Sequence, residues 1–221
     1  MSRTKLKKFK EINNMPHVIQ PQRQELLDDE FTLKGRWSVR FGNNYPICLE
    51  LGCGKGEYTV ALAKANPKVN YIGIDIKGSR IYSGAEIVRK EKLLNVIFIR
   101  TQIEHLASLF NENEVNEIWI TFPDPQLKYN RRRKRLVHSS MLKKYQKILI
   151  NSGVVHLKTD SLFLHGYALG ILENGPYKIL HSTHDLYKNK LLEMSLNIKT
   201  YYEQIFLNNH QPITYLSFSF L

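Results

Sequence analysis

Five polar residues lie at or just beyond the ends of short apolar runs, and they are Glu50, Asp75, Gln102, Asp124 and Asp160. Apolar runs of this length are typical of buried parallel strands. In an open parallel sheet, ligands bind beyond the carboxyl ends of the strands. Because four of the five side chains are carboxylates, the sequence predicts a cleft that suits a cationic ligand.

Three alternating glycines, Gly52, Gly54 and Gly56, follow the first apolar run and precede a helix-forming stretch. Strand, glycine-rich turn and helix form the opening of a nucleotide-binding crossover unit, where glycine lets a ligand approach the backbone. The spacing differs from the G-x-G-x-x-G of dinucleotide folds, and Glu50 and Glu57 would repel a phosphate. S-adenosylmethionine, which has an ammonium, a sulfonium and no phosphate, suits this loop. A tight turn in an ordinary α/β protein is the structural alternative.

Asp75 ends the second apolar run, residues 70–76, and lies 19 residues beyond Gly56. An acidic residue about 20 residues after the glycine loop is placed to accept hydrogen bonds from ribose hydroxyls. The alternative is a helix N-cap. Because Gly78 and Ser79 are better placed to cap the next helix, we favour the ribose role.

Asp124 lies between Pro123 and Pro125, which restrict the backbone on both sides. A carboxylate held this rigidly at a strand tip is preorganised for a target group, and we favour this over a turn whose Asp satisfies backbone donors. Asp160 ends the fifth apolar run. For Asp160, a site residue and an N-cap for the helix from Ser161 onward are equally good interpretations.

A basic run follows Asp124 at residues 128–135, where six of eight residues are cationic: Lys128, Arg131, Arg132, Arg133, Lys134 and Arg135. Cations beside a cleft favour contact with RNA phosphates, and Tyr129 within the run could stack on a base. A solvated face or a targeting patch is the alternative.

The overall charge agrees with a polyanionic partner, because the 221 residues carry a formal net charge of +12. Nucleic acid is the first candidate and an anionic membrane surface the second. No window approaches the roughly 18 apolar residues of a membrane span. The charged first ten residues lack an apolar signal core, so we expect a cytoplasmic protein. The two cysteines, Cys48 and Cys53, lack zinc-site spacing, and we expect no metal.

Strand and helix signals alternate from residue 47, which predicts an α/β fold with a parallel sheet. Residues 1–14 are expected to form a flexible basic arm, residues 15–46 are unassigned, and 15–221 should form one domain. By composition, residues 200–203 read as a loop. The expected strands are 47–51, 70–76, 95–100, 117–122, 153–159, 177–182 and 212–220, and the expected helices are 58–65, 79–94, 103–110, 139–150 and 162–172.

From about residue 45 to its end, the chain resembles the bacterial tRNA (guanine-N7)-methyltransferases. The resemblance rests on LELGCGKG at 49–56, GID at 73–75, FPDP at 122–125 with the basic run after it, TD at 159–160 and TYYE at 200–203. The first two motifs occur in many methyltransferases, whereas FPDP with its basic run is far more specific.

The resemblance implies a Rossmann-like class I methyltransferase fold. Its mostly parallel seven-stranded sheet would have helices on both faces and an antiparallel C-terminal strand. It implies methyl transfer from S-adenosylmethionine to N7 of the variable-loop guanine of tRNA, position 46 in tRNA numbering, by a monomer or homodimer. Methylation of another RNA and RNA binding without catalysis stay open.

The resemblance also assigns residues. The donor contacts would be Glu50, Gly52, Gly54, Gly56, Asp75, Gln102 and the catalytic Asp124, and the substrate contacts Lys128, Asp160, Thr200, Tyr201, Tyr202 and Glu203. The sequence departs from the family at Gln126, where Trp is usual, and at Gln102, where Asn or Asp is common. Asp75 replaces a Glu that some members use.

Overall fold

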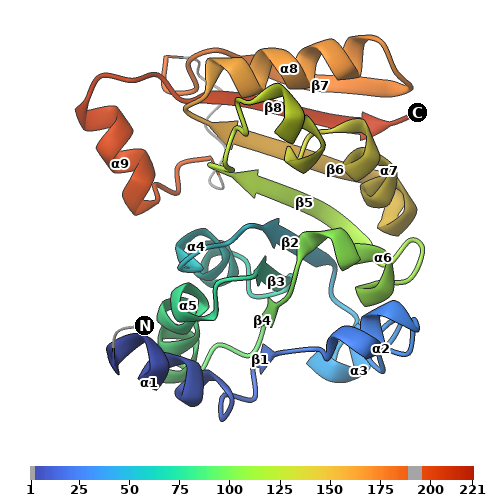
Figure 1. Ribbon diagram of the computed structural model, residues 1–221, viewed down its shortest axis with the longest axis vertical. Coiled ribbons are helices and arrows are strands. Elements are labelled where there is room, and N and C mark those ends of the chain that lie inside the picture. The colour runs from blue at the N-terminus through green and yellow to red at the C-terminus, as the bar shows by residue number, and fades with distance from the viewer. Residues whose placement is uncertain (1–2, 189–195) are drawn as a thin grey trace.

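The computed structural model describes residues 3–188 and 196–221, whose strands form one eight-stranded sheet in the order β1-β4-β3-β2-β5-β6-β8-β7 (Figure 1). All neighbouring strands up to β6 are parallel, and β8 runs antiparallel to both β6 and β7. The strands are β1 (Val18–Ile19), β2 (Ile47–Leu51), β3 (Asn70–Asp75), β4 (Val96–Arg100), β5 (Val115–Thr121), β6 (Leu149–Thr159), β7 (Tyr177–Thr183) and β8 (Thr214–Phe220).

The predicted fold class is confirmed, because the seven expected strands are β2 to β8 and the last one is antiparallel. The additional strand, β1, has two residues and, among the described strands, pairs only with β4, so it is too short to show a periodic pattern. Every residue of β2 and β3 is buried, as expected for central parallel strands with both faces covered. The strand order reverses at β2, which has β3 on one side and β5 on the other.

Helices cover both faces of the sheet, as predicted. One core cluster contains residues of α2, α3, α6, α7 and α8, and the other contains residues of α1, α4 and α5. None of the helices within the described residues is both long and apolar enough to cross a membrane. The helices are α1 (Arg3–Ile12), α2 (Arg23–Leu27), α3 (Trp37–Phe41), α4 (Glu57–Ala65), α5 (Gly78–Glu91), α6 (Leu106–Leu109), α7 (Ser139–Ile148), α8 (Leu162–Glu173) and α9 (Tyr201–Asn208), with 3-10 turns η1 (Ile103–His105) and η2 (Tyr129–Lys134).

The N-terminal segment differs from the predicted flexible arm, because most of it is helix α1, lying beside α5 (Figure 1). Ile12 is fully buried, and the Arg100 guanidinium lies 4.6 Å from the centre of the Phe9 ring. A Cβ on Gly78 would come within 2.8 Å of Ile12, so glycine lets α1 approach the start of α5. Phe9 and Ile12, three positions apart, thus hold α1 against the protein. The high charge of this segment is why its sequence did not predict a helix. That residues 15–221 form one domain stays a prediction.

One buried ring, Phe98 of β4, joins three segments of the fold. Cβ atoms built on Gly56, Gly73 and Gly84 would lie 2.5, 2.8 and 2.8 Å from this ring. These glycines belong to the loop after β2, to β3 and to α5. The ring therefore fills the space that three side chains would need, and it fixes the glycine loop against the sheet.

Candidate active site

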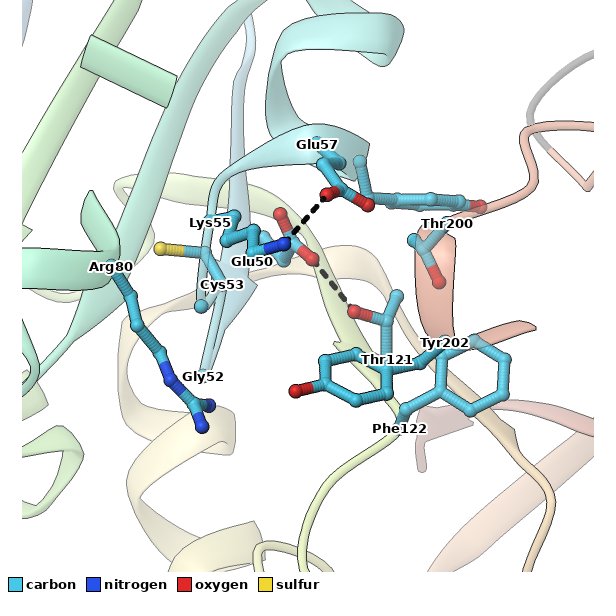
Figure 2. Close-up of a pocket in the computed structure, with 12 residues that line it drawn as sticks. Glu50, Gly52, Cys53, Lys55, Glu57, Arg80, Thr121, Phe122, Thr200 and Tyr202 are labelled. Atoms are coloured by element: carbon cyan, nitrogen blue, oxygen red, sulfur yellow. Dashed lines mark hydrogen bonds and ion pairs between the residues drawn. The ribbon is translucent and has the colours of Figure 1, made fainter. Parts of the chain in front are cut away.

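Two adjoining hollows form a cleft beyond the carboxyl ends of β2, β3 and β5, and they share Gly52, Arg80 and Phe122. This is the edge at which ligands of open α/β sheets bind, at the point where the strand order reverses. The first hollow lies between the glycine loop and the start of α9 (Figure 2). The second extends along the ends of β3, β4 and β5.

Most of the predicted donor contacts meet in this cleft. The predicted residues that line it are Glu50, Gly52, Gly54, Asp75, Gln102, Asp124, Lys134, Thr200 and Tyr202. Arg80 in the first turn of α5 and Thr121 at the tip of β5 also line the cleft, and neither was among the predicted residues. Thr121 directly precedes FPDP, so that motif could have indicated it, whereas Arg80 lies five residues beyond Asp75. Of the predicted residues, Gly56, Lys128, Asp160, Tyr201, Glu203 and Arg131, Arg132, Arg133 and Arg135 line neither hollow.

Glu50 is the buried carboxylate at the floor of the first hollow, with 3% of its surface exposed. Its Oε1 accepts a hydrogen bond from the Thr121 hydroxyl at 2.6 Å (Figure 2), and its Oε2 accepts from the Thr59 N–H at 2.9 Å and from the Thr59 hydroxyl. Burial raises the pKa of Glu50 to about 7, although these hydrogen bonds oppose the shift. Within the described part of the chain Glu50 forms no ion pair, so a cationic ligand would restore its charge.

The glycine loop is open toward the cleft at two of its three glycines. Gly52 and Gly54 have φ values of 78° and 55°, and a Cβ on either would meet nothing closer than 4.0 Å. Asp75 holds this loop, because its Oδ2 accepts from the Gly54 N–H at 2.9 Å and its Oδ1 from the Lys77 N–H at 2.7 Å. The N-cap of α5 is Lys77, one residue before the cap that we expected.

Gly56 is placed differently from its two neighbours. It is the N-cap of α4, with φ 71°, and it faces Phe98 rather than the cleft. Gly56 lines neither hollow, and its predicted donor contact stays a prediction. Here glycine is required by packing and by the left-handed backbone.

Asp124 is exposed on a loop whose two ends have left-handed backbone, at Phe122 (φ 48°) and Gln126 (φ 47°). Its Oδ1 accepts a hydrogen bond from the Gln126 N–H at 2.9 Å. The turn interpretation therefore accounts for one carboxylate oxygen. Non-glycine residues rarely adopt this conformation, and such residues gather at functional sites.

Arg135 supports the Asp124 loop from within the protein. It is 4% exposed, and it donates to the Gln126 carbonyl from Nη2 at 3.0 Å and from Nε at 3.2 Å. Its guanidinium also lies 4.7 and 4.3 Å from the centres of the Phe163 and Tyr167 rings. These groups enclose the charge of Arg135, and its predicted role as an RNA-backbone contact stays a prediction.

The rest of the basic run lies on η2 at the surface. Arg131, Arg133 and Lys134 are exposed, and the Arg132 guanidinium lies 4.1 Å from the centre of the exposed Tyr129 ring. Lys134 also lines the second hollow. The phosphate contacts of these residues, and the substrate contact of the exposed Lys128, stay predictions.

The TYYE stretch is not the loop that its composition suggested, because it begins helix α9 with a capping box. The Thr200 hydroxyl accepts from the Glu203 N–H at 3.3 Å, and Glu203 Oε2 accepts from the Thr200 N–H at 3.3 Å. A Thr followed by Glu three residues later is the sequence signature of this motif. Glu203 is fully buried, and its predicted contact with substrate stays a prediction.

Two further predicted substrate residues lie outside the cleft. The exposed Tyr201 ring packs under the Lys55 ammonium, 4.8 Å from the ring centre. Asp160 is half-buried, and burial raises its pKa. It is not the N-cap of α8, because Ser161 occupies that position and accepts from the Leu164 N–H at 3.2 Å. The N-cap alternative for Asp160 is therefore excluded.

The fold and the cleft define a class I methyltransferase. Solved structures of this class share the fold at low identity, among them the 16S rRNA methyltransferase KamB (TM-score 0.64, 13% identity, 84% of this chain and 93% of that chain). An S-adenosylmethionine-dependent methyltransferase from Aquifex aeolicus gives a TM-score of 0.56 at 14% identity, over 96% of this chain and 98% of that one. A family model described as putative methyltransferase matches residues 44–216.

Curated relatives narrow the class. A protein of Christiangramia forsetii named tRNA (guanine-N(7)-)-methyltransferase is 53% identical over 98% of both chains. A protein of the same name from Bacteroides fragilis is 42% identical over 99% of this chain and 86% of its own. Another from Bacillus subtilis is 34% identical over 81% of this chain and 83% of its own. The chain therefore belongs to the tRNA (guanine-N7)-methyltransferase family, and the resemblance seen in its motifs is confirmed.

Proposed function

We propose that this protein transfers the methyl group of S-adenosylmethionine to N7 of a guanine in tRNA, at position 46 of the variable loop, in the cytoplasm. The relatives carry the corresponding name. The observation that carries the proposal is a cleft that has a buried carboxylate on its floor, the Asp124 loop on one wall and the exposed Lys134 of η2 in its lining.

The residues of the first hollow fit the methyl donor. Glu50 is a buried carboxylate with no ion pair among the described residues, and the donor carries an ammonium and a sulfonium. Gly52 and Gly54 leave room for a ligand against the backbone. When bound, the donor would supply an electrophilic methyl group. We assign Glu50, Gly52, Gly54, Asp75 and Gln102 to its binding.

The side chains need only align the reactants and stabilise charge. N7 of guanine already carries an accessible lone pair on the major-groove edge, so no general base is required. Walls that hold the base and the donor in line can supply much of the rate by proximity. Asp124, which is exposed and fixed by its loop, would stabilise the positive charge that develops on the guanine ring. The target base would leave its stack to reach the cleft.

The test is incubation of the protein with labelled donor and unmodified tRNA, followed by mass analysis of the nucleosides. We expect 7-methylguanosine, and none when position 46 of the tRNA is adenosine. Asp124→Ala should lower turnover about a hundredfold or more without unfolding the protein. The control is Asp28→Ala, because Asp28 is an exposed acid outside the cleft.

Other outcomes would contradict parts of the proposal. Label in rRNA but not in tRNA would show that rRNA, rather than tRNA, is the substrate. RNA binding without any methylated product would favour a binding module. Wild-type turnover of Asp124→Ala would remove Asp124 from the reaction.

A further inference from the structure

Lys158, near the end of β6, is a buried cation that none of the site assignments uses. Its side chain is completely buried, and its ammonium lies 2.8 Å from Glu203 Oε1, whose side chain is also fully buried. The ammonium also donates to the carbonyls of Leu196 at 3.1 Å and Ile198 at 3.0 Å. All three acceptors belong to α9 or to the residues just before it.

The Glu203 carboxylate contacts Lys158, Tyr187 and Thr200. Its Oε1 faces Lys158 and also accepts a hydrogen bond from the Tyr187 hydroxyl at 2.6 Å, while its Oε2 closes the capping box with Thr200. Burial lowers the pKa of Lys158, and the Glu203 carboxylate opposes this shift. The ion pair therefore ties the first turn of α9 to the tip of a central strand.

The same turn forms one wall of the cleft. Thr200 and Tyr202 line the first hollow on the side opposite the glycine loop (Figure 2). A second tie is at the surface, where Glu57 Oε2 accepts from the Tyr201 N–H at 2.8 Å. Of these two ties, only the Lys158–Glu203 contact is sealed from water and charged at both ends.

We propose that Lys158 and Glu203 are positioning residues, whose buried ion pair sets the place of Thr200 and Tyr202 in the wall of the cleft. Apolar residues of similar size would often stabilise a core as well as a buried ion pair does. A charged pair with four further hydrogen-bond partners instead requires one arrangement of strand and helix. The kinetic consequence rests on the proposed function, whereas the structural consequence does not.

Hydrogen exchange measures the structural part without any reaction. In Lys158→Met we expect the amides of residues 201–208 to exchange at least tenfold faster than in the wild type, and those of β2, β3 and β4 at the wild-type rate. Lys199→Met is the matched control, because Lys199 is an exposed lysine just before α9 and packs only on the Tyr187 ring among its described contacts. Its exchange should equal that of the wild type.

Steady-state kinetics with tRNA measure the functional part. Lys158→Met and Glu203→Gln should each lower kcat/KM about a hundredfold, because a wall displaced by about 1 Å costs this much. The double variant should lose no more than either single variant, since both changes break one interaction. Lys199→Met should keep the wild-type kcat/KM.

Unchanged exchange of α9 in Lys158→Met would overturn the proposal. Equally faster exchange throughout the sheet would also overturn it, because the pair would then stabilise the whole fold. Additive losses of kcat/KM in the double variant would overturn it as well. If Lys158→Met does not fold, the nearly isosteric Glu203→Gln provides the exchange and kinetic readouts under the same criteria. If the wild type does not methylate tRNA, the proposed function fails, and the exchange experiment still decides the role of the ion pair.

Discussion

At the scale of single residues, the protonation of Glu50 should control binding of the donor. Its pKa is raised from 4.5 to about 7 by burial. A folded-state pKa above the unfolded value means that its contribution to stability is fully present below about pH 4.5 and is lost as the pH rises to about 7. A cationic ligand acts in the opposite direction, because it favours the ionised carboxylate.

We therefore expect the Kd of S-adenosylmethionine to be about tenfold higher at pH 6 than at pH 8, since a group with a pKa near 7 loses its charge over this range. Calorimetric titration at several pH values would measure this. Glu50→Gln, which cannot ionise, should bind more weakly and with no pH dependence of this kind. Equal Kd values for the wild type at pH 6 and pH 8 would show that the charge of Glu50 does not hold the donor.

Residue types and spacing predicted the acidic half of the site but not which charges are buried. Glu50, Asp75 and Asp124 were found because each ends a strand signal, and topology brings strand ends together. The burial of Arg135 and Glu203 was not predicted, because a sequence does not show that a charge is enclosed by partners far along the chain. Glu203 meets Lys158 across 45 residues, and no local pattern connects the two.

At the scale of elements, the turn from β2 into α4 depends on Gly56. Gly56→Ala should lower the free energy of unfolding by about 2 kcal/mol or more, because a left-handed Ala costs roughly 1–2 kcal/mol and the new Cβ meets Phe98 at 2.5 Å. Chemical denaturation would measure the loss.

The matched control is Gly166→Ala on α8, where a Cβ would meet nothing within 4 Å. Because alanine favours a helix more than glycine does, this change should raise stability by up to about 1 kcal/mol. Equal effects of the two substitutions would contradict the packing argument for Gly56.

Element boundaries from residue 47 onward were mostly predictable from apolar periodicity, and β2 was predicted with its observed bounds. The failures have identifiable causes. Strand β1 has only two residues and is defined by its partner β4. Helix α1 is mostly charged and is held by a few apolar contacts. Helix α9 begins with a capping-box signature, Thr200 and Glu203, but the composition of residues 200–203 had suggested a loop.

At the scale of the whole molecule, the excess positive charge should act through the exposed cations of η2. Arg131→Ala with Arg133→Ala should weaken tRNA binding and lower the slope of log K against log salt by about 0.7–0.9 for each phosphate that the protein no longer neutralises. Binding titrations at several salt concentrations would measure the slope.

The control for this experiment is Lys68→Ala with Lys90→Ala. Both lysines are exposed. Lys68 lies just before β3 and Lys90 near the end of α5, so both are at the amino ends of the strands, opposite the cleft. This pair removes the same charge, so its slope should stay near the wild-type value. A slope reduced equally by both pairs would mean that overall charge, rather than η2, attracts the RNA.

The packing of Phe98 against three glycines has a consequence for how this family can vary. Substitutions at positions 56 and 98 should show epistasis, because a smaller side chain at 98 removes the clash that Gly56→Ala creates. Suppressors of Gly56→Ala selected for recovered stability should therefore include changes of Phe98. Changes of Phe98 should not suppress Gly84→Ala. The Cβ of an alanine at position 84 would also lie 2.7 Å from the Lys55 carbonyl oxygen, and a change of side chain does not remove that backbone atom.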